Sequence, residues 1–224
     1  MNRQLAETLE KKLGIFQEQI VREEYEMIIL KALFDSELGK FFIFRGGTAL
    51  RLAYGSPRFS VDLDFSIIGD IDKKKLKELL KKISDQNTSL QLKEALQKKF
   101  TYFGLFKVKE DFLKQSFSIK FEASIRRVKM VKDRDYKLVV LKSNVTSLTV
   151  LAQVASLEWI KKEKKSIKPA RIRDIFDLWF INQKLGKPTK MDFKGWDVRI
   201  VRGELHKLLP LNERMLLKQW LPEK

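Results

Sequence analysis

The chain has 224 residues, of which 44% are hydrophobic, so it can bury the core of one large domain or of a catalytic core with a smaller lobe. It has no cysteine and a single histidine, His206, which excludes disulfides, zinc–thiolate sites and thiol catalysis and argues against a Ser–His triad. The net charge of +17, from 46 Lys and Arg against 29 Asp and Glu, favours a polyanionic partner, nucleic acid first, although a charge-rich surface kept for solubility would have the same composition.

The N-terminal residues are charged and polar, which is not the pattern of a signal peptide. No apolar run reaches the length of a membrane span. We therefore expect a cytoplasmic protein without a membrane partner.

Two helices and a strand are predicted first in chain order. Apolar residues recur with helical spacing over Leu5–Leu13 and Ile15–Leu38, and Gly14 and Gly39 follow these segments as helix-terminal glycines do. The short apolar run Phe41–Phe44 is stopped by glycine and is typical of a buried strand.

A Gly-Gly turn follows this strand. Gly46 and Gly47 allow the backbone to turn sharply and to come close to a ligand. Residues from Thr48 to Tyr54 are predicted to form a helix whose N-terminal N–H groups point back at the turn, where they would suit a phosphate. Gly46, Gly47 and Thr48 are therefore candidate nucleotide-binding residues.

Asp62 and Asp64 lie on the next predicted strand. Being two residues apart, they project from the same face at roughly 6–7 Å spacing. Neighbouring carboxylates repel, so the pKa of one rises unless a cation lies between them, and Mg²⁺ is the hard cation that suits nucleotide phosphates. A solvent-exposed edge strand would give the same pattern. The glycine turn upstream, with Arg58 and Ser60 between, favours the metal site.

The stretch Phe41–Ser66 resembles the signature of the AbiEii-type nucleotidyltransferases, which are toxins of abortive-infection and toxin–antitoxin systems. In that family a GG[ST] turn, an Arg-x-Ser and a DxDF strand follow in this order, as they do here. The resemblance implies a polymerase-β-like nucleotidyltransferase core with an NTP as donor. It also implies RNA as acceptor, with a tRNA 3′ end as the candidate, and a cognate antitoxin protein as partner.

The middle of the chain predicts further helices and strands. A lysine-rich amphipathic helix covers Ile71–Ser84, and a second helix is expected over Leu90–Phe100. Strands are expected over Tyr102–Val108, Gln115–Ile125 and Lys137–Leu141.

Glu122 lies in the polar face of the strand Gln115–Ile125, where apolar and polar residues alternate. The family resemblance places its third acidic residue in such a strand, so we assign Glu122 as the third ligand of a two-metal site with Asp62 and Asp64. The alternative is an exposed Glu beside Lys120.

From about residue 147 the pattern turns helical for the rest of the chain. We therefore predict an α/β (α+β) fold: a nucleotidyltransferase-like mixed sheet core with N-terminal helices over residues 1–145, and a helical C-terminal lobe over residues 146–224.

The C-terminal lobe contains a second match to the family. The segment 148–160 is apolar and periodic, residues 161–168 form a basic connection, and 171–182 predicts a helix. That helix matches the family's RDxxDL motif, which implies that Asp174 and Asp177 help to hold the nucleotide and the catalytic lysine. The alternative is an intrahelical Arg–Asp pair of little energetic worth.

One departure from the family concerns this lysine. The family precedes the RDxxDL helix with an A-E-K type helix, and the nearest match is taken to be residues 151–155, where Gln and Val replace the acid and the lysine. Lys161, Lys162, Lys164 or Lys165 could supply the amine, and we take Lys161 and Lys162 as the candidates because they follow most closely.

The sequence thus predicts an enzyme that uses two Mg²⁺ ions and an NTP, in which Arg58 contacts phosphate because a guanidinium matches it bidentately. Two alternatives stay open. A protein of the same fold could bind RNA or nucleotide without transfer, or the acceptor could be a protein hydroxyl.

Overall fold

The computed structural model describes residues 1–126 and 128–221. Within these residues one mixed sheet of seven strands has the order β3-β4-β5-β2-β1-β7-β6. The strands are β1 (Phe42–Arg45), β2 (Asp62–Ile67), β3 (Leu90–Lys98), β4 (Thr101–Val108), β5 (Phe117–Ser124), β6 (Tyr136–Leu141) and β7 (Val150–Ala155). The helices are α1 (Arg3–Leu13), α2 (Gln17–Phe34), α3 (Gly46–Tyr54), α4 (Lys73–Asp85), α5 (Leu157–Ser166), α6 (Ile172–Lys184), α7 (Val198–His206) and α8 (Met215–Lys218). The α/β fold class with a mixed sheet is as predicted.

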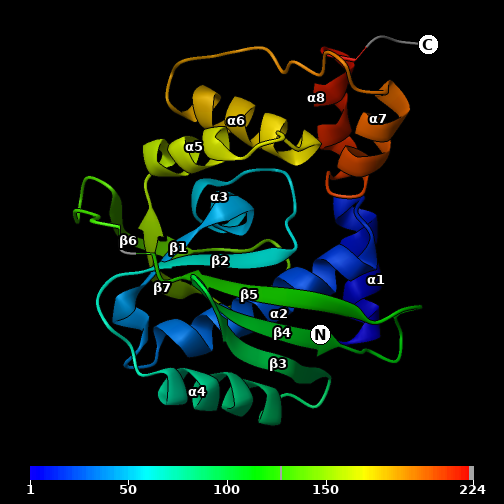
Figure 1. Ribbon diagram of the computed structural model, residues 1–224. Coiled ribbons are helices and arrows are strands. Elements are labelled where there is room, and N and C mark those ends of the chain that lie inside the picture. The colour runs from blue at the N-terminus through cyan, green and yellow to red at the C-terminus, as the bar shows by residue number, and fades with distance from the viewer. Residues whose placement is uncertain (127, 222–224) are drawn as a thin grey trace.

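Helices lie on both sides of the sheet. In Figure 1, α3 lies directly above β1 and β2, α5 and α6 lie above α3, and α4 lies below β3. The core between the sheet and α2 is built around phenylalanine rings, with the centroids of Phe65 and Phe121 4.8 Å apart. The opposite, polar face of β2 is thereby turned toward α3 and α5.

Strand pairing fixes the centre of the sheet. β2 is antiparallel to β1 and parallel to β5, and β1 is parallel to β7. Each central strand has neighbours far away in sequence, so the centre forms only when distant segments of the chain come together.

Most predicted elements are confirmed with small shifts at their ends. Helix α4 begins after Asp72, whose side chain accepts a hydrogen bond from the backbone N–H of Lys74 at 2.8 Å. Helix α2 ends at Phe34, earlier than predicted, and Gly39 begins a 3-10 turn that leads into β1.

Two segments predicted to be helical are strands instead. Residues Leu90–Lys98 form β3, because they pair as a hairpin with β4 and place Leu90 and Leu92 on the face that packs against the core. The apolar run Val150–Ala155 forms β7, since pairing with β1 and β6 buries it in the sheet. A short apolar run does not by itself distinguish a buried strand from a helix.

Strand β7 follows the boundary predicted at residue 145 and belongs to the same sheet as β1. The division of the chain into domains at that position stays a prediction. The predicted basic connection is helical over most of its length, because α5 extends to Ser166. No helix among the described residues has both the length and the apolar character needed to cross a membrane.

Candidate active site

The predicted Gly-Gly turn forms the first two residues of α3, which follows β1 directly, and it lies against β2. Gly46 has φ +82°, and a Cβ there would lie 2.5 Å from Oδ2 of Asp64. A Cβ on Gly47 would lie 2.5 Å from Nη2 of Arg58 and 2.7 Å from Oγ of Ser60. Only glycine allows this close approach. The first turn of α3 has no side-chain cap, so its N–H groups are available to an anion.

The three carboxylates predicted as metal ligands line one cavity beside this turn, together with Glu163 of α5. Asp62 and Asp64 project from β2, and Glu122 lies opposite Asp64 on the neighbouring strand β5. The cavity measures about 140 Å³, and the sequence-predicted residues that line it are Gly46, Gly47, Arg58, Ser60, Asp62, Asp64 and Glu122. The structure thus brings together the turn and the carboxylates from three separate segments.

Burial raises the pKa of Asp64. The guanidinium of Arg45 opposes this rise, and the negative charge of Asp62 adds to it. A bound cation would compensate the charge on Asp64.

These carboxylates suit Mg²⁺ by their chemistry. Oxygen ligands are what hard divalent cations take in proteins, and burial, the main cause of the raised pKa of Asp64, also makes a bound cation a favourable partner for this carboxylate. In the part of the chain that the structure describes, no three His, Cys, Asp or Glu side chains are already gathered as a metal site. Coordination by Asp62, Asp64 and Glu122 therefore stays a prediction.

Lys164 of α5 brings an amine to the cavity wall. Its Nζ lies 2.9 Å from Oδ1 of Asp174 and 2.6 Å from Oδ2 of Asp177, and its side chain is 8% exposed. Arg58 donates two hydrogen bonds of 2.8 Å to Asp177, and Arg171 donates to Asp174. Buried carboxylates on α6 therefore hold Lys164 and Arg58 in place.

The two carboxylates of this network have lowered pKa values, so they are ionised at neutral pH. Burial alone would raise the pKa of Asp174, but hydrogen bonding from Arg171 and the charge of Lys164 outweigh it and lower the pKa to about 2. The pKa of Asp177 is likewise lowered, because Arg58 and Lys164 outweigh its burial.

Several predicted residues lie behind the cavity rather than on its wall. Asp174 and Asp177 are completely buried and contact the cations described above. The hydroxyl of Thr48 donates to the backbone carbonyl of Asp62 at 2.5 Å, so this side chain ties α3 to β2. Thr48 could contact a nucleotide only through its backbone.

Lys161 and Lys162 do not line the cavity. Lys162 is exposed, with its Nζ 5.8 Å from the ring centroid of Trp159, and Lys164 from the next turn lines the cavity instead. The assumed A-E-K position at residues 151–155 is wrong, because that segment is strand β7. The helix before α6 is α5, where Glu163-Lys164 keeps the last two residues of the motif. That pair was the sequence signal for Lys164.

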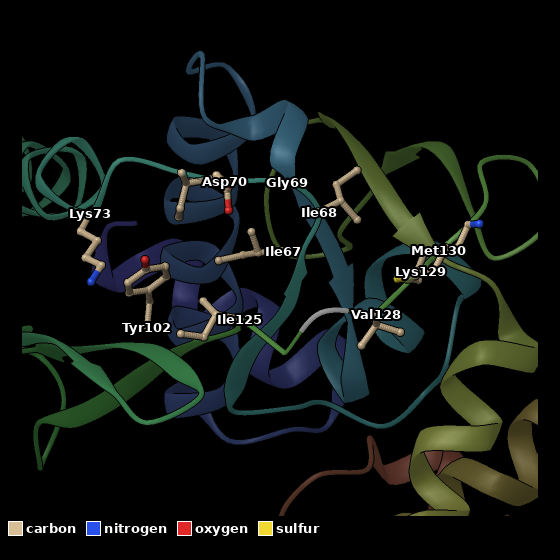
Figure 2. Close-up of a pocket in the computed structure, with 11 residues that line it drawn as sticks. Ile67, Ile68, Gly69, Asp70, Lys73, Tyr102, Ile125, Val128, Lys129 and Met130 are labelled. Atoms are coloured by element: carbon tan, nitrogen blue, oxygen red, sulfur yellow. The ribbon is translucent and has the colours of Figure 1, made fainter.

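A larger cavity, about 850 Å³, opens at the other end of β2 (Figure 2). Ile67, Ile125 and Tyr102 line it, and Asp70 is its only carboxylate among the described lining residues. None of the predicted site residues lies there. The groups suited to phosphate chemistry are gathered in the smaller cavity.

The sequence matches a family model along most of its length. The model is described as nucleotidyl transferase AbiEii toxin, type IV TA system, and it covers residues 28–222. The chain belongs to the AbiEii family. It is therefore a nucleotidyltransferase toxin of a class that uses an NTP substrate and has an antitoxin partner.

Solved structures share the fold. A putative nucleotidyltransferase from H. pylori aligns with a TM-score of 0.56 and 21% identity, over 89% of this chain and 90% of its own. JHP933 from Helicobacter pylori gives 0.55 and 21%, over 79% and 71%. MenT4, a nucleotidyltransferase toxin from Mycobacterium tuberculosis H37Rv, gives 0.55 and 18%, over 83% of this chain and 62% of its own. No curated protein matches the sequence.

Proposed function

We propose that this AbiEii protein uses Mg²⁺ to transfer a nucleoside monophosphate from an NTP to RNA, with the 3′ end of a tRNA as the candidate acceptor. The observation that carries the proposal is one cavity lined by the two β2 aspartates, Glu122, the Gly-Gly turn and Lys164. An NTP needs a place for its phosphates, counter-charges and a ligand set for its cation. The cavity offers all three.

The triphosphate would lie against the Gly-Gly turn. The uncapped N-terminus of α3 offers N–H groups, and the side chains of Arg45 and Arg171 line the same cavity. Arg58 is largely engaged by Asp177, so its contribution to phosphate binding would be indirect. Its guanidinium packs against Gly47 and would help to hold the backbone there in position.

The carboxylates would act on the reacting groups. Asp62, Asp64 and Glu122 would hold two Mg²⁺ ions, which when bound lower the pKa of the acceptor hydroxyl and offset the phosphate charge. The hydroxyl would release its proton to water, and its oxygen would form a bond to the α-phosphorus while the bond from that phosphorus to the β-phosphate oxygen breaks and pyrophosphate leaves.

Lys164 would stabilise the leaving group. Negative charge builds on pyrophosphate in the transition state, and an ammonium already fixed by two carboxylates can stabilise it without rearrangement. An amine in this position supports transfer over a role in binding alone. The net charge of +17 supports a nucleic-acid acceptor over a protein hydroxyl. We place the reaction in the cytoplasm, where an antitoxin would control it.

The test is incubation of the protein with each labelled NTP, Mg²⁺ and total RNA, with the products resolved by size. We expect label from at least one NTP to enter a tRNA-sized band, and none with Asp64→Asn. Label in the protein fraction would favour the protein-hydroxyl reading. An absence of product with every NTP would contradict transfer and leave a binding protein.

A further inference from the structure

The strands β3, β4 and β5 carry exposed side chains on the face that does not meet the core. Leu80 of α4 packs against the opposite face at Gly104, where a Cβ would lie 3.2 Å from its Cδ1. On the free face, Lys107 and Lys120 are exposed, and Leu96 is 45% exposed. We call Leu96, Lys98, Phe103, Leu105, Lys107 and Lys120 the open sheet face.

This face continues directly from the proposed active site. The registers place Asp64 opposite Glu122, Glu122 opposite Phe103, and Phe103 opposite Leu96. Directly opposed residues share a face, and neighbouring strands are about 4.8 Å apart, so Phe103 begins about 5 Å beyond Glu122. A ring and then an aliphatic side chain therefore extend the row that starts with the carboxylates.

Phe103 belongs to neither hydrophobic core cluster. Its side chain is only 8% exposed, and Nζ of Lys98, 3.6 Å from the ring centroid, is one of the groups that cover the ring. Beyond it, at the hairpin between β3 and β4, Phe100 is 44% exposed, with Lys99 and Arg126 within 5.3 Å of its ring centroid. Aromatic rings paired with cations are a means of holding single-stranded nucleic acid.

The charge of the face is mainly positive. Lys98, Lys107 and Lys120 lie on it, and across β3, β4 and β5, all of which the structure describes, Glu94 is its one carboxylate besides Glu122. A polyanion is the partner that this face complements. Duplex RNA would offer phosphates but keep its bases stacked, whereas a single strand can place bases on the rings.

We propose that the open sheet face binds the single-stranded end of an RNA acceptor, with a base on Phe103 and phosphates on Lys107 and Lys120. The proposal rests on the proposed function, because it directs the terminal hydroxyl toward Asp64 and Glu122. Lys98 moves from the ring to a phosphate when the base stacks.

The test is equilibrium binding of a labelled single-stranded RNA of about 12 nucleotides, within the range of known single-strand site sizes, without NTP and with EDTA. Phe103→Leu keeps apolar volume but loses the ring, and we expect affinity to fall about tenfold, within the range for loss of one stacked base. The double variant Lys107→Ala/Lys120→Ala changes only exposed side chains. It should weaken binding and lower the log–log salt slope by about 1.4, which is about 0.7 for each phosphate contact.

The matched control is Lys75→Ala/Lys82→Ala on the exposed side of α4. It removes the same charge from another part of the surface and should leave the slope unchanged. The proposal is overturned if both lysine pairs have equal effects, if Phe103→Leu binds like the wild type, or if polyglutamate competes as well as RNA.

Failure of this proposal can be told apart from failure of the proposed function. If the wild type labels RNA and the open-sheet-face variants bind and transfer normally, the acceptor binds elsewhere and the function stands. If no NTP gives product but the open-sheet-face variants lose RNA binding, the binding surface stands and transfer is contradicted.

Discussion

Replacing Lys164 by methionine tests the buried charge network at the site. Methionine keeps most of the side-chain length and removes the ammonium that lies 2.9 Å from Asp174 and 2.6 Å from Asp177. Both carboxylates are completely buried, and they keep Arg171 and Arg58 as their other partners. The variant is therefore expected to fold with a network that has one cation fewer.

The loss of stability expected for Lys164→Met can be worked out from the charge interactions of the network. The shift of the Asp174 pKa from 3.8 to about 2 corresponds to about 2 kcal/mol, shared between Arg171 and Lys164. Breaking a buried pair by removing one partner costs about 3–5 kcal/mol, and the remaining arginines favour the low end. At about 2–4 °C per kcal/mol for a chain of this size, we expect the melting temperature of Lys164→Met to fall by about 10 °C.

The sign of the pH dependence is fixed by the lowered pKa of Asp174. Such a carboxylate contributes stability above its unfolded pKa, near 4, and loses it as the pH falls toward about 2. The stability difference between wild type and Lys164→Met should therefore be full at pH 7 and shrink below pH 4.

Urea unfolding followed by circular dichroism at pH 7 and at pH 3 measures both effects, with Lys165→Met as an exposed control on the same helix. Transfer by Lys164→Met should fall at least about 100-fold, or about 2.7 kcal/mol of transition-state stabilisation. A variant with the wild-type midpoint at pH 7 would refute the buried network, and one with wild-type transfer would refute the role of the amine.

Three further outcomes are expected. Asp64→Asn should abolish transfer, and retained transfer would contradict the metal assignment. The same variant should not destabilise the metal-free protein, because the raised pKa of Asp64 means that its ionisation costs stability as the pH rises. Gly47→Ala should weaken NTP binding and cost about 1–3 kcal/mol of stability through overpacking, since its Cβ would lie 2.5 Å from Nη2 of Arg58. Nucleotide titration and urea unfolding measure these two effects, and wild-type values for both would contradict the close approach. Replacing Lys161 and Lys162 together by alanine should change the transfer rate less than about twofold, because neither lines the cavity; a tenfold loss would restore them as the catalytic amines.

The sequence alone determined the stretch from Phe41 to Ser66, including the strand, the glycine turn, the helix and the paired aspartates. These features are local, since glycine stops one element and opens the next, and a spacing of two places both carboxylates on one face. The family and the fold class followed from this stretch. Helix α4 could be predicted equally well, because its cap and its apolar spacing lie within one short segment.

Only the tertiary structure decided that residues Val150–Ala155 form a strand and that Lys164 lines the cavity. The apolar run fits a helix or a buried strand, and its pairing with β1 more than 100 residues earlier selects the strand. Because strand β7 ends at Ala155, Ser156 becomes the N-cap of α5 and accepts a hydrogen bond from the N–H of Trp159. The start of the helix then determines the side to which each of its lysines points. One of these lysines then meets the carboxylates of α6. The position of this lysine depends on contacts between distant segments of the chain, which the local sequence does not specify.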